Sequence, residues 1–252
     1  GHYVRVAERF GAKRLTRHYK TAFYSLQNFL VSQVFSSFVK YQIYYIIFPI
    51  HKKYNTKTKK ALFWLRYGNI IYENAFWSDY NTMKYDASIY RGVFCALNAI
   101  YDENDNINTD AIKALVTKYK QLGVNGIYAC GSTGEGFLLS TEERMQVAEA
   151  VKEAAGDDMA VIVHVGAAST KEACILARHA EKIGVSAVSA VPSVYYRLSE
   201  ASIEKHWDTI MDATELPFFI YNIPQLTGYD LSFELFEKMA KKEKVIGIKN
   251  SS

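Results

Sequence analysis

A lysine, a tyrosine and a hydroxyl-rich turn are the residues of this chain best suited to chemistry. Lys249 closes the apolar run 245–249, and Tyr221 closes the run 217–221. A lysine that ends an apolar strand points into a desolvated pocket, where its pKa falls and its neutral amine becomes a nucleophile. The alternative is a lysine whose stem follows a barrel rim while its ammonium stays in water. The presence of a tyrosine and of hydroxyls at other strand ends favours the nucleophile.

The hydroxyl-rich turn is residues 131–136, with the sequence Gly-Ser-Thr-Gly-Glu-Gly. Its small residues let the backbone approach a ligand closely. Ser132 and Thr133 add two adjacent hydroxyls beside backbone N–H groups, and this set of donors suits a carboxylate. No Gly-Lys-Ser/Thr follows, which excludes a P-loop. Taken alone, the pattern fits a purely structural turn equally well.

The elements that must position these residues begin near residue 90. From there, short apolar runs alternate with amphipathic helical patterns, which is typical of βα units and a parallel sheet. Ser140 and Ser169 each stand three residues before a glutamate, so we expect a capping box at the start of two of the helices. We expect six strands, at 93–99, 126–130, 160–165, 187–191, 217–221 and 245–249.

The regular βα units favour a (β/α)8 TIM barrel over a doubly wound sheet, because no glycine fingerprint for a dinucleotide follows the first strand. Closing an eight-stranded barrel needs two units more than this sequence contains. We therefore expect an α/β fold, a TIM barrel truncated after about the sixth strand. Active sites of such barrels lie at the carboxyl ends of the strands, where Lys249, Tyr221 and the turn are found.

Residues 1–82 differ from the rest in composition. Residues 1–88 hold 14 lysines and arginines against 4 acidic residues, together with 21 of the 36 aromatic residues. Residues 89–252 hold 16 basic against 22 acidic residues. Tyr, Phe, Ile, Lys and Asn have A/T-rich codons, and Met83 directly precedes the regular part. We interpret 1–82 as an atypical, poorly ordered extension, either read through from upstream DNA or misannotated, and 83–252 as the partial barrel.

Two segments of this extension could suggest other partners. The uncharged stretch 21–39 is long enough to span a bilayer, but seven polar residues interrupt it, so we expect no membrane helix. The basic run 51–60 could bind phosphate or an anionic surface, and we interpret it instead as a solvated charge run. Neither segment predicts a membrane or nucleic-acid partner.

The cysteines and histidines argue against metal and disulfide sites. The three cysteines have no C-x-x-C spacing, so neither a disulfide framework nor a structural zinc site is expected. The histidines have no paired ligand spacing either. A reducing, cytoplasmic location fits this pattern best.

Three motifs in register resemble the N-acetylneuraminate lyase / dihydrodipicolinate synthase family of class I aldolases. They are Gly-Ser-Thr-Gly-Glu at 131–135, Tyr-Asn-Ile-Pro at 221–224, and Lys249. The resemblance covers 83–252 and does not touch 1–82. It implies small-molecule substrates, no metal or organic cofactor, and a homotetramer for full-length members. The Gly-x-Asp-Glu segment that binds sugar hydroxyls in the lyases lies beyond residue 252, which leaves an inactive truncated barrel with exposed strand edges as one alternative.

Within the family, short segments such as His-Val-Gly at 164–166 and Lys-Asn-Ser-Ser at 249–252 are more similar to the lyases. The resemblance then implies that Lys249 forms a Schiff base with N-acetylneuraminate and that Tyr221 moves the proton of the C4 hydroxyl, giving N-acetylmannosamine and pyruvate. It also implies that Ser132 and Thr133 hold the substrate carboxylate and that Ser251 contacts the sugar.

Other positions bear on the pocket and on the choice of substrate. Tyr195 and Tyr196 are loop aromatics that could line the pocket or pack between subunits, and His164 could line it or be a structural histidine. Synthases of the family carry an arginine for the carboxylate of an amino-acid aldehyde where this chain has Leu226. Leucine cannot supply a bidentate fork, which counts against the synthase. Another pyruvate-dependent aldolase or synthase of the dihydrodipicolinate type stays the second alternative.

Overall fold

The computed structural model describes residues 47–49 and 84–252. The chain divides into the units Gly1–Ile43 and Tyr44–Ser252, and all described residues belong to the second unit. The stretch 21–39 and the basic run 51–60 lie outside the described residues, as does nearly all of the segment interpreted as an extension. Among the helices that the structure describes, none is long and apolar enough to cross a membrane.

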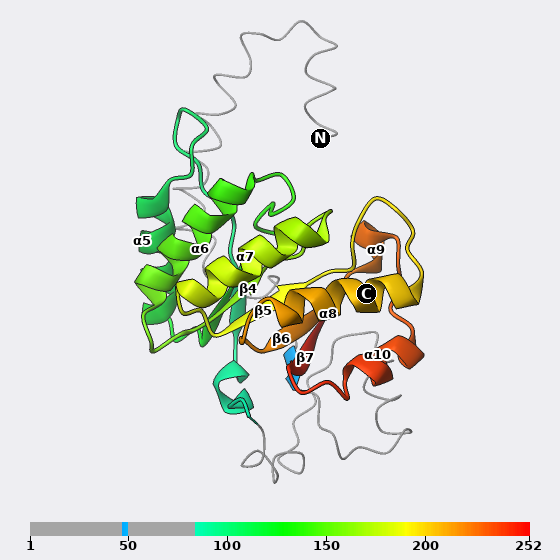
Figure 1. Cartoon of the computed structure of the whole chain (residues 1–252). Coiled ribbons are helices and arrows are strands. Elements are labelled where there is room, and N and C mark those ends of the chain that lie inside the picture. The colour runs from blue at the N-terminus through cyan, green and yellow to red at the C-terminus, as the bar shows by residue number, and fades with distance from the viewer. Residues whose placement is uncertain (1–46, 50–83) are drawn as a thin grey trace, which may run out of the picture. The chain divides into compact units, whose positions relative to one another are not determined.

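The core of the fold is a curled parallel half-barrel of six strands, consistent with part of a TIM barrel (Figure 1). The sheet order is β1-β7-β6-β5-β4-β3-β2. Neighbours among the last six are parallel, whereas β1 pairs antiparallel with β7. The strands are β1 (Ile47–Pro49), β2 (Phe94–Ala96), β3 (Gly126–Ala129), β4 (Ala160–His164), β5 (Ala187–Ala190), β6 (Phe218–Asn222) and β7 (Val245–Asn250).

All six predicted strands are confirmed, five of them to within one residue at either end. The first strand, predicted at 93–99, is shorter and covers only Phe94–Ala96. The Leu97 N–H still donates to the Tyr128 carbonyl of β3 at 3.0 Å, and the chain leaves the sheet after that residue. β1 was not predicted, since three residues are too few to show an alternating pattern.

Helices follow the strands along the chain. They are η3 (Ala87–Tyr90), α5 (Thr109–Gln121), α6 (Thr141–Ala155), α7 (Thr170–Lys182), α8 (Glu200–Asp212), α9 (Pro224–Thr227) and α10 (Phe233–Met239). The predicted capping box at Ser140 is confirmed in both directions. Only one of the two hydrogen bonds of the capping box predicted at Ser169 is present. Ser169 accepts from the Glu172 N–H, but the Glu172 carboxylate accepts from the Thr141 hydroxyl at 3.1 Å instead of from the Ser169 N–H. The glutamate thereby ties the start of α7 to the start of α6.

Alternate residues of each strand face two different apolar layers, as the pleat of a strand requires. On β6, Phe218 and Ile220 join the large cluster shared with the helices, whereas Phe219 and Tyr221 join a smaller cluster on the inner face of the half-barrel. Tyr128 of β3 belongs to the same inner cluster. The inner face is therefore the side on which several strands can present residues to one site.

Candidate active site

Five polar side chains meet on the inner face near the carboxyl ends of the strands, and each is at most 2% exposed. They are contributed by five successive strands, β3 to β7. We refer to them as the inner polar cluster: Tyr128, His164, Ser189, Tyr221 and Lys249. Polar groups buried together in this way are held by contacts among themselves and with the backbone.

Lys249 lies at the centre of these contacts. It is paired in register with Tyr221 on the neighbouring strand, and its Nζ lies 3.5 Å from the centroid of the Tyr221 ring. The same Nζ lies 4.9 Å from the Tyr128 ring centroid and donates to the Ser251 hydroxyl at 3.3 Å. Burial lowers the pKa of Lys249 to about 6. The amine is therefore mostly neutral at pH 7 and can act as a nucleophile.

Tyr221 points its hydroxyl toward the hydroxyl-rich turn. Its phenolic oxygen lies 3.3 Å from the Ser132 Oγ, within hydrogen-bonding distance. Its ring meets the rings of Tyr128 and His164 edge-on, with centroids 5.7 Å away in both cases. The structure thus brings together Lys249, Tyr221 and Ser132, three of the residues singled out from the sequence.

The turn after β3 depends on its glycines. Cys130 has a φ of 58°, in the left-handed region, so the chain reverses sharply at the end of the strand. A Cβ on Gly136 would lie 1.9 Å from the Cys130 carbonyl oxygen, and one on Gly134 would lie 2.7 Å from the Leu97 carbonyl oxygen. Ser132 at the tip of the turn is exposed. Close backbone packing therefore explains the glycines and leaves the hydroxyls at the open end of the strands.

His164 has the contacts of a structural histidine. Its Nε2 accepts from the Val191 N–H at 3.3 Å, so Nδ1 carries the proton and donates to the Cys130 carbonyl at 3.1 Å. Burial, and next the charge of Arg144, lower its pKa well below the usual range. Arg144 also donates to the His164 carbonyl at 2.7 Å. The neutral imidazole thus supports the Tyr221 ring.

Of the remaining predicted residues, Ser251 and Thr133 are half-buried near the site, whereas Tyr195 and Tyr196 lie on the surface. Ser251 is half-buried, accepts from Lys249, and donates its N–H to the Asn222 carbonyl at 2.9 Å. Thr133 is half-buried in the turn, and its carbonyl accepts from the Asn98 amide at 3.5 Å. Tyr195 and Tyr196 are 89% and 73% exposed, and their rings pack edge-on against each other at 4.9 Å.

Sequence reasoning missed Tyr128 and Ser189. The Tyr128 hydroxyl donates to the Ser189 Oγ at 3.0 Å across the inner face. The signal that could have found them is a polar atom inside an otherwise apolar strand, since a buried hydroxyl needs a partner. The strand around Tyr128 is Gly-Ile-Tyr-Ala, and the strand around Ser189 is Ala-Val-Ser-Ala.

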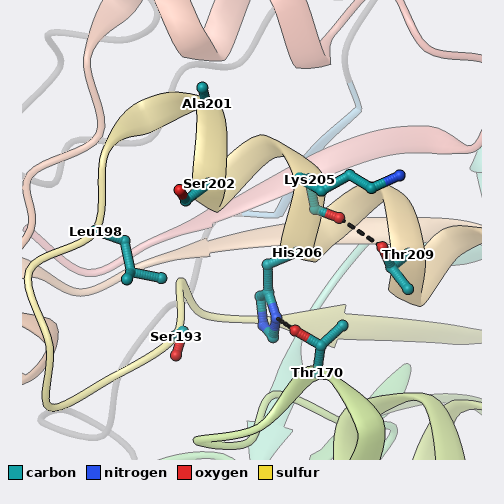
Figure 2. Close-up of a pocket in the computed structure, with 8 residues that line it drawn as sticks. All are labelled: Thr170, Ser193, Leu198, Ala201, Ser202, Lys205, His206 and Thr209. Carbon is teal, nitrogen blue, oxygen red and sulfur yellow. Dashed lines mark hydrogen bonds between the residues drawn. The ribbon is translucent and has the colours of Figure 1, made fainter.

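A hollow of about 420 Å³ lies away from the inner polar cluster, between the start of α7, the loop after β5, and α8 (Figure 2). In it the His206 Nδ1 lies 2.8 Å from the Thr170 hydroxyl, while its Nε2 is buried without a partner in the described residues. Its lining is Thr170, Ser193, Leu198, Ala201, Ser202, Lys205, His206 and Thr209, none of which belongs to the inner polar cluster. Among the described residues, no group of three or more His, Cys, Asp or Glu could hold a metal ion.

The sequence of the chain is similar to those of known proteins. The model of the dihydrodipicolinate synthetase family matches residues 89–252. The N-acetylneuraminate lyase of Mediterraneibacter gnavus is 43% identical over 164 residues, which are 65% of this chain and 52% of that protein.

Two solved structures are similar as well. The sialic acid aldolase of Ruminococcus gnavus superposes with a TM-score of 0.64 at 42% identity, covering 65% of this chain and 55% of that one. An E. coli prophage protein of the dihydrodipicolinic acid synthase family, solved in complex with pyruvate, superposes with a TM-score of 0.61 at 27% identity. That match covers 63% of this chain and 54% of the other. The chain therefore spans about half the length of these relatives.

Proposed function

The chain belongs to the dihydrodipicolinate synthetase family, and we propose that it is part of a Schiff-base aldolase that cleaves N-acetylneuraminate to N-acetylmannosamine and pyruvate. The observation that carries the proposal is the buried amine of Lys249, whose pKa is lowered to about 6 and which lies 3.5 Å from the Tyr221 ring centroid. Relatives named N-acetylneuraminate lyase and a relative bound to pyruvate support the same chemistry.

The proposed reaction starts with attack of the neutral Lys249 amine on the C2 ketone of the open-chain sugar acid. Loss of water gives an iminium, which accepts the electron pair of the C3–C4 bond as that bond breaks. Tyr221 takes up the proton of the C4 hydroxyl, and the aldehyde of N-acetylmannosamine leaves. Protonation of the remaining enamine at C3 and hydrolysis of the iminium release pyruvate and restore Lys249.

Substrate binding in this proposal uses the open end of the half-barrel. Ser132 and Thr133 hold the carboxylate through their hydroxyls and backbone N–H groups, because Ser132 is exposed on the turn beside the Tyr221 hydroxyl and the half-buried Thr133 follows it directly. Ser251, in contact with the Lys249 amine, faces the sugar portion. Leu226 of α9 is 65% exposed and offers no donor to the carboxylate of an amino-acid aldehyde, which favours the sugar over the synthase substrate.

The setting of the reaction is proposed on the same basis. All three cysteines, Cys95, Cys130 and Cys174, are free thiols, as a reducing cytoplasm would keep them. We propose no organic cofactor, since the Schiff base itself accepts the electrons, and a homotetramer for the full-length protein.

The test supplies the chain with N-acetylneuraminate and follows pyruvate release through a coupled lactate dehydrogenase assay. We expect release that is abolished in Lys249→Met and unchanged in the matched control Lys205→Met, an exposed lysine of α8. A parallel assay offers pyruvate with aspartate semialdehyde. Condensation there without release from the sugar acid would identify a synthase instead, and inactivity in both assays would identify the inactive barrel.

A further inference from the structure

Tyr128 contacts both Lys249 and Tyr221, although the sequence predicts no role for it. Its ring centroid lies 4.9 Å from the Lys249 Nζ and 5.7 Å from the centroid of the Tyr221 ring, which it meets at 77°. The proposed nucleophile and the proposed proton carrier therefore share one buried aromatic neighbour. A change in the position of that ring would alter the surroundings of both groups.

The Tyr128 ring is fixed at two further points. Its hydroxyl donates to the Ser189 Oγ at 3.0 Å, and Ser189 is fully buried on β5. A Cβ on Gly131 would lie 2.6 Å from the Tyr128 Cε1, so the first residue of the hydroxyl-rich turn lies directly against the ring. A close-packed side chain with a buried hydrogen bond has little freedom to move.

We propose that Tyr128 is a positioning residue, anchored by Ser189 and Gly131, that holds the Lys249 amine and the Tyr221 ring in their mutual geometry and keeps water from the amine. The inference rests on the proposed function and deepens it. Tyr128 itself exchanges no proton or bond with the substrate. It acts on the reaction through Lys249 and Tyr221.

The surroundings of Lys249 make this role measurable. Among the described residues, the titratable side chains of Tyr128, His164 and Tyr221 face it. Burial is the cause of the lowered pKa of Lys249, and the Tyr128 ring forms part of that burial. A smaller side chain at this position admits water beside the amine, and its pKa then rises toward the ordinary value.

The experiment measures the reactivity of the Lys249 amine itself, so it does not depend on turnover. The full chain is labelled with limiting acetic anhydride over a range of pH, and peptide mass spectrometry gives the midpoint for Lys249. We expect the midpoint of Tyr128→Leu to rise by about one pH unit, while Tyr128→Phe, which keeps the ring, stays near wild type. Tyr128→Met also lacks the ring and is smaller than tyrosine, and its flexible side chain repacks more easily than leucine, so it should show the same upward shift where the leucine variant fails to fold.

Tyr90→Leu is the matched control. Tyr90 is also a buried tyrosine on the inner face, 4% exposed, and its hydroxyl donates to the Ser186 carbonyl. Its ring, however, packs against the rings of Phe94 and Phe219. We expect this variant to lose stability without a shift in the Lys249 midpoint. An unshifted midpoint in both Tyr128→Leu and Tyr128→Met, or an equal shift in Tyr90→Leu, would overturn the proposal.

A second readout separates this inference from the proposed function. Pyruvate and borohydride are added to the same variants, and the initial rate of adduct formation at Lys249 is measured at pH 7. We expect a rate about twofold lower in Tyr128→Leu than in wild type, because a rise in the pKa from about 6 to about 7 lowers the neutral fraction of the amine at pH 7 from about 90% to about 50%. A wild-type chain that forms no adduct contradicts the proposed function, while the acetylation midpoints still decide the role of Tyr128.

Discussion

Ser251 supplies a polar contact to the Lys249 amine, and replacing it by aspartate tests how the site sets the pKa of that amine. The Ser251 Oγ lies 3.3 Å from the Lys249 Nζ, so a carboxylate there would lie within about 4 Å of the nitrogen. A nearby negative charge favours the ammonium form. Ser251→Asp should therefore raise the pKa and remove the nucleophile at neutral pH.

The size of the effect follows from the distance. Two unit charges about 4 Å apart interact by about 4 kcal/mol at the effective dielectric of a protein site, which corresponds to a shift of about 3 pKa units. The pKa of Lys249 would move from about 6 to roughly 9. At pH 7 the neutral fraction of the amine then falls from about 90% to about 1%, a loss of about 100-fold.

The assay is the initial rate of pyruvate adduct formation at Lys249, trapped with borohydride between pH 5 and pH 10. Ser251→Asn is the matched control, because asparagine has nearly the same shape as aspartate without its charge. We expect the aspartate variant to be slow at pH 7 and to recover above pH 9, and the asparagine variant to keep a midpoint near pH 6. Equal midpoints in the two variants would refute the reasoning.

Three further outcomes are expected. Tyr221→Phe should still form the pyruvate adduct but release pyruvate from the sugar acid about 10³-fold more slowly, because the proton carrier is lost; equal release would rule out that role. Burial lowers the pKa of His206 to about 4, so the unfolded chain binds the extra proton and stability should fall by about 3 kcal/mol as the pH drops from 6.5 to 4. Urea unfolding should show a smaller loss of stability between these pH values in His206→Gln and an unchanged loss in His179→Gln. Equal losses in the two variants would contradict this role of His206. Gly136→Ala should cost about 3 kcal/mol by the same method, because its Cβ would overlap the Cys130 carbonyl; a wild-type midpoint would argue against this turn geometry.

The sequence predicts the sheet well because its parallel strands are buried on both faces. Runs such as 160–165 and 217–221 read as continuous apolar segments, and their ends are close to those of β4 and β6. The family resemblance inferred from three short motifs is confirmed by the match over residues 89–252. Local patterns alone led to these predictions.

Contacts between strands were less predictable. Tyr128 and Ser189 lie 61 residues apart in the chain, and only the alignment of β3, β4 and β5 brings their hydroxyls together. The irregular register near Phe218 likewise depends on how β6 meets β7. Glu172 shows the same limit at a helix start, because its local pattern predicts a capping box whereas a neighbouring helix supplies the actual partner.

The central claim is that the Lys249 amine forms a Schiff base. The direct measurement incubates the chain with pyruvate, reduces it with borohydride, and maps the adduct by peptide mass spectrometry. We predict one adduct, on the peptide that carries Lys249, and none in Lys249→Met. The absence of an adduct on that peptide, or labelling spread evenly over exposed lysines, would contradict the account.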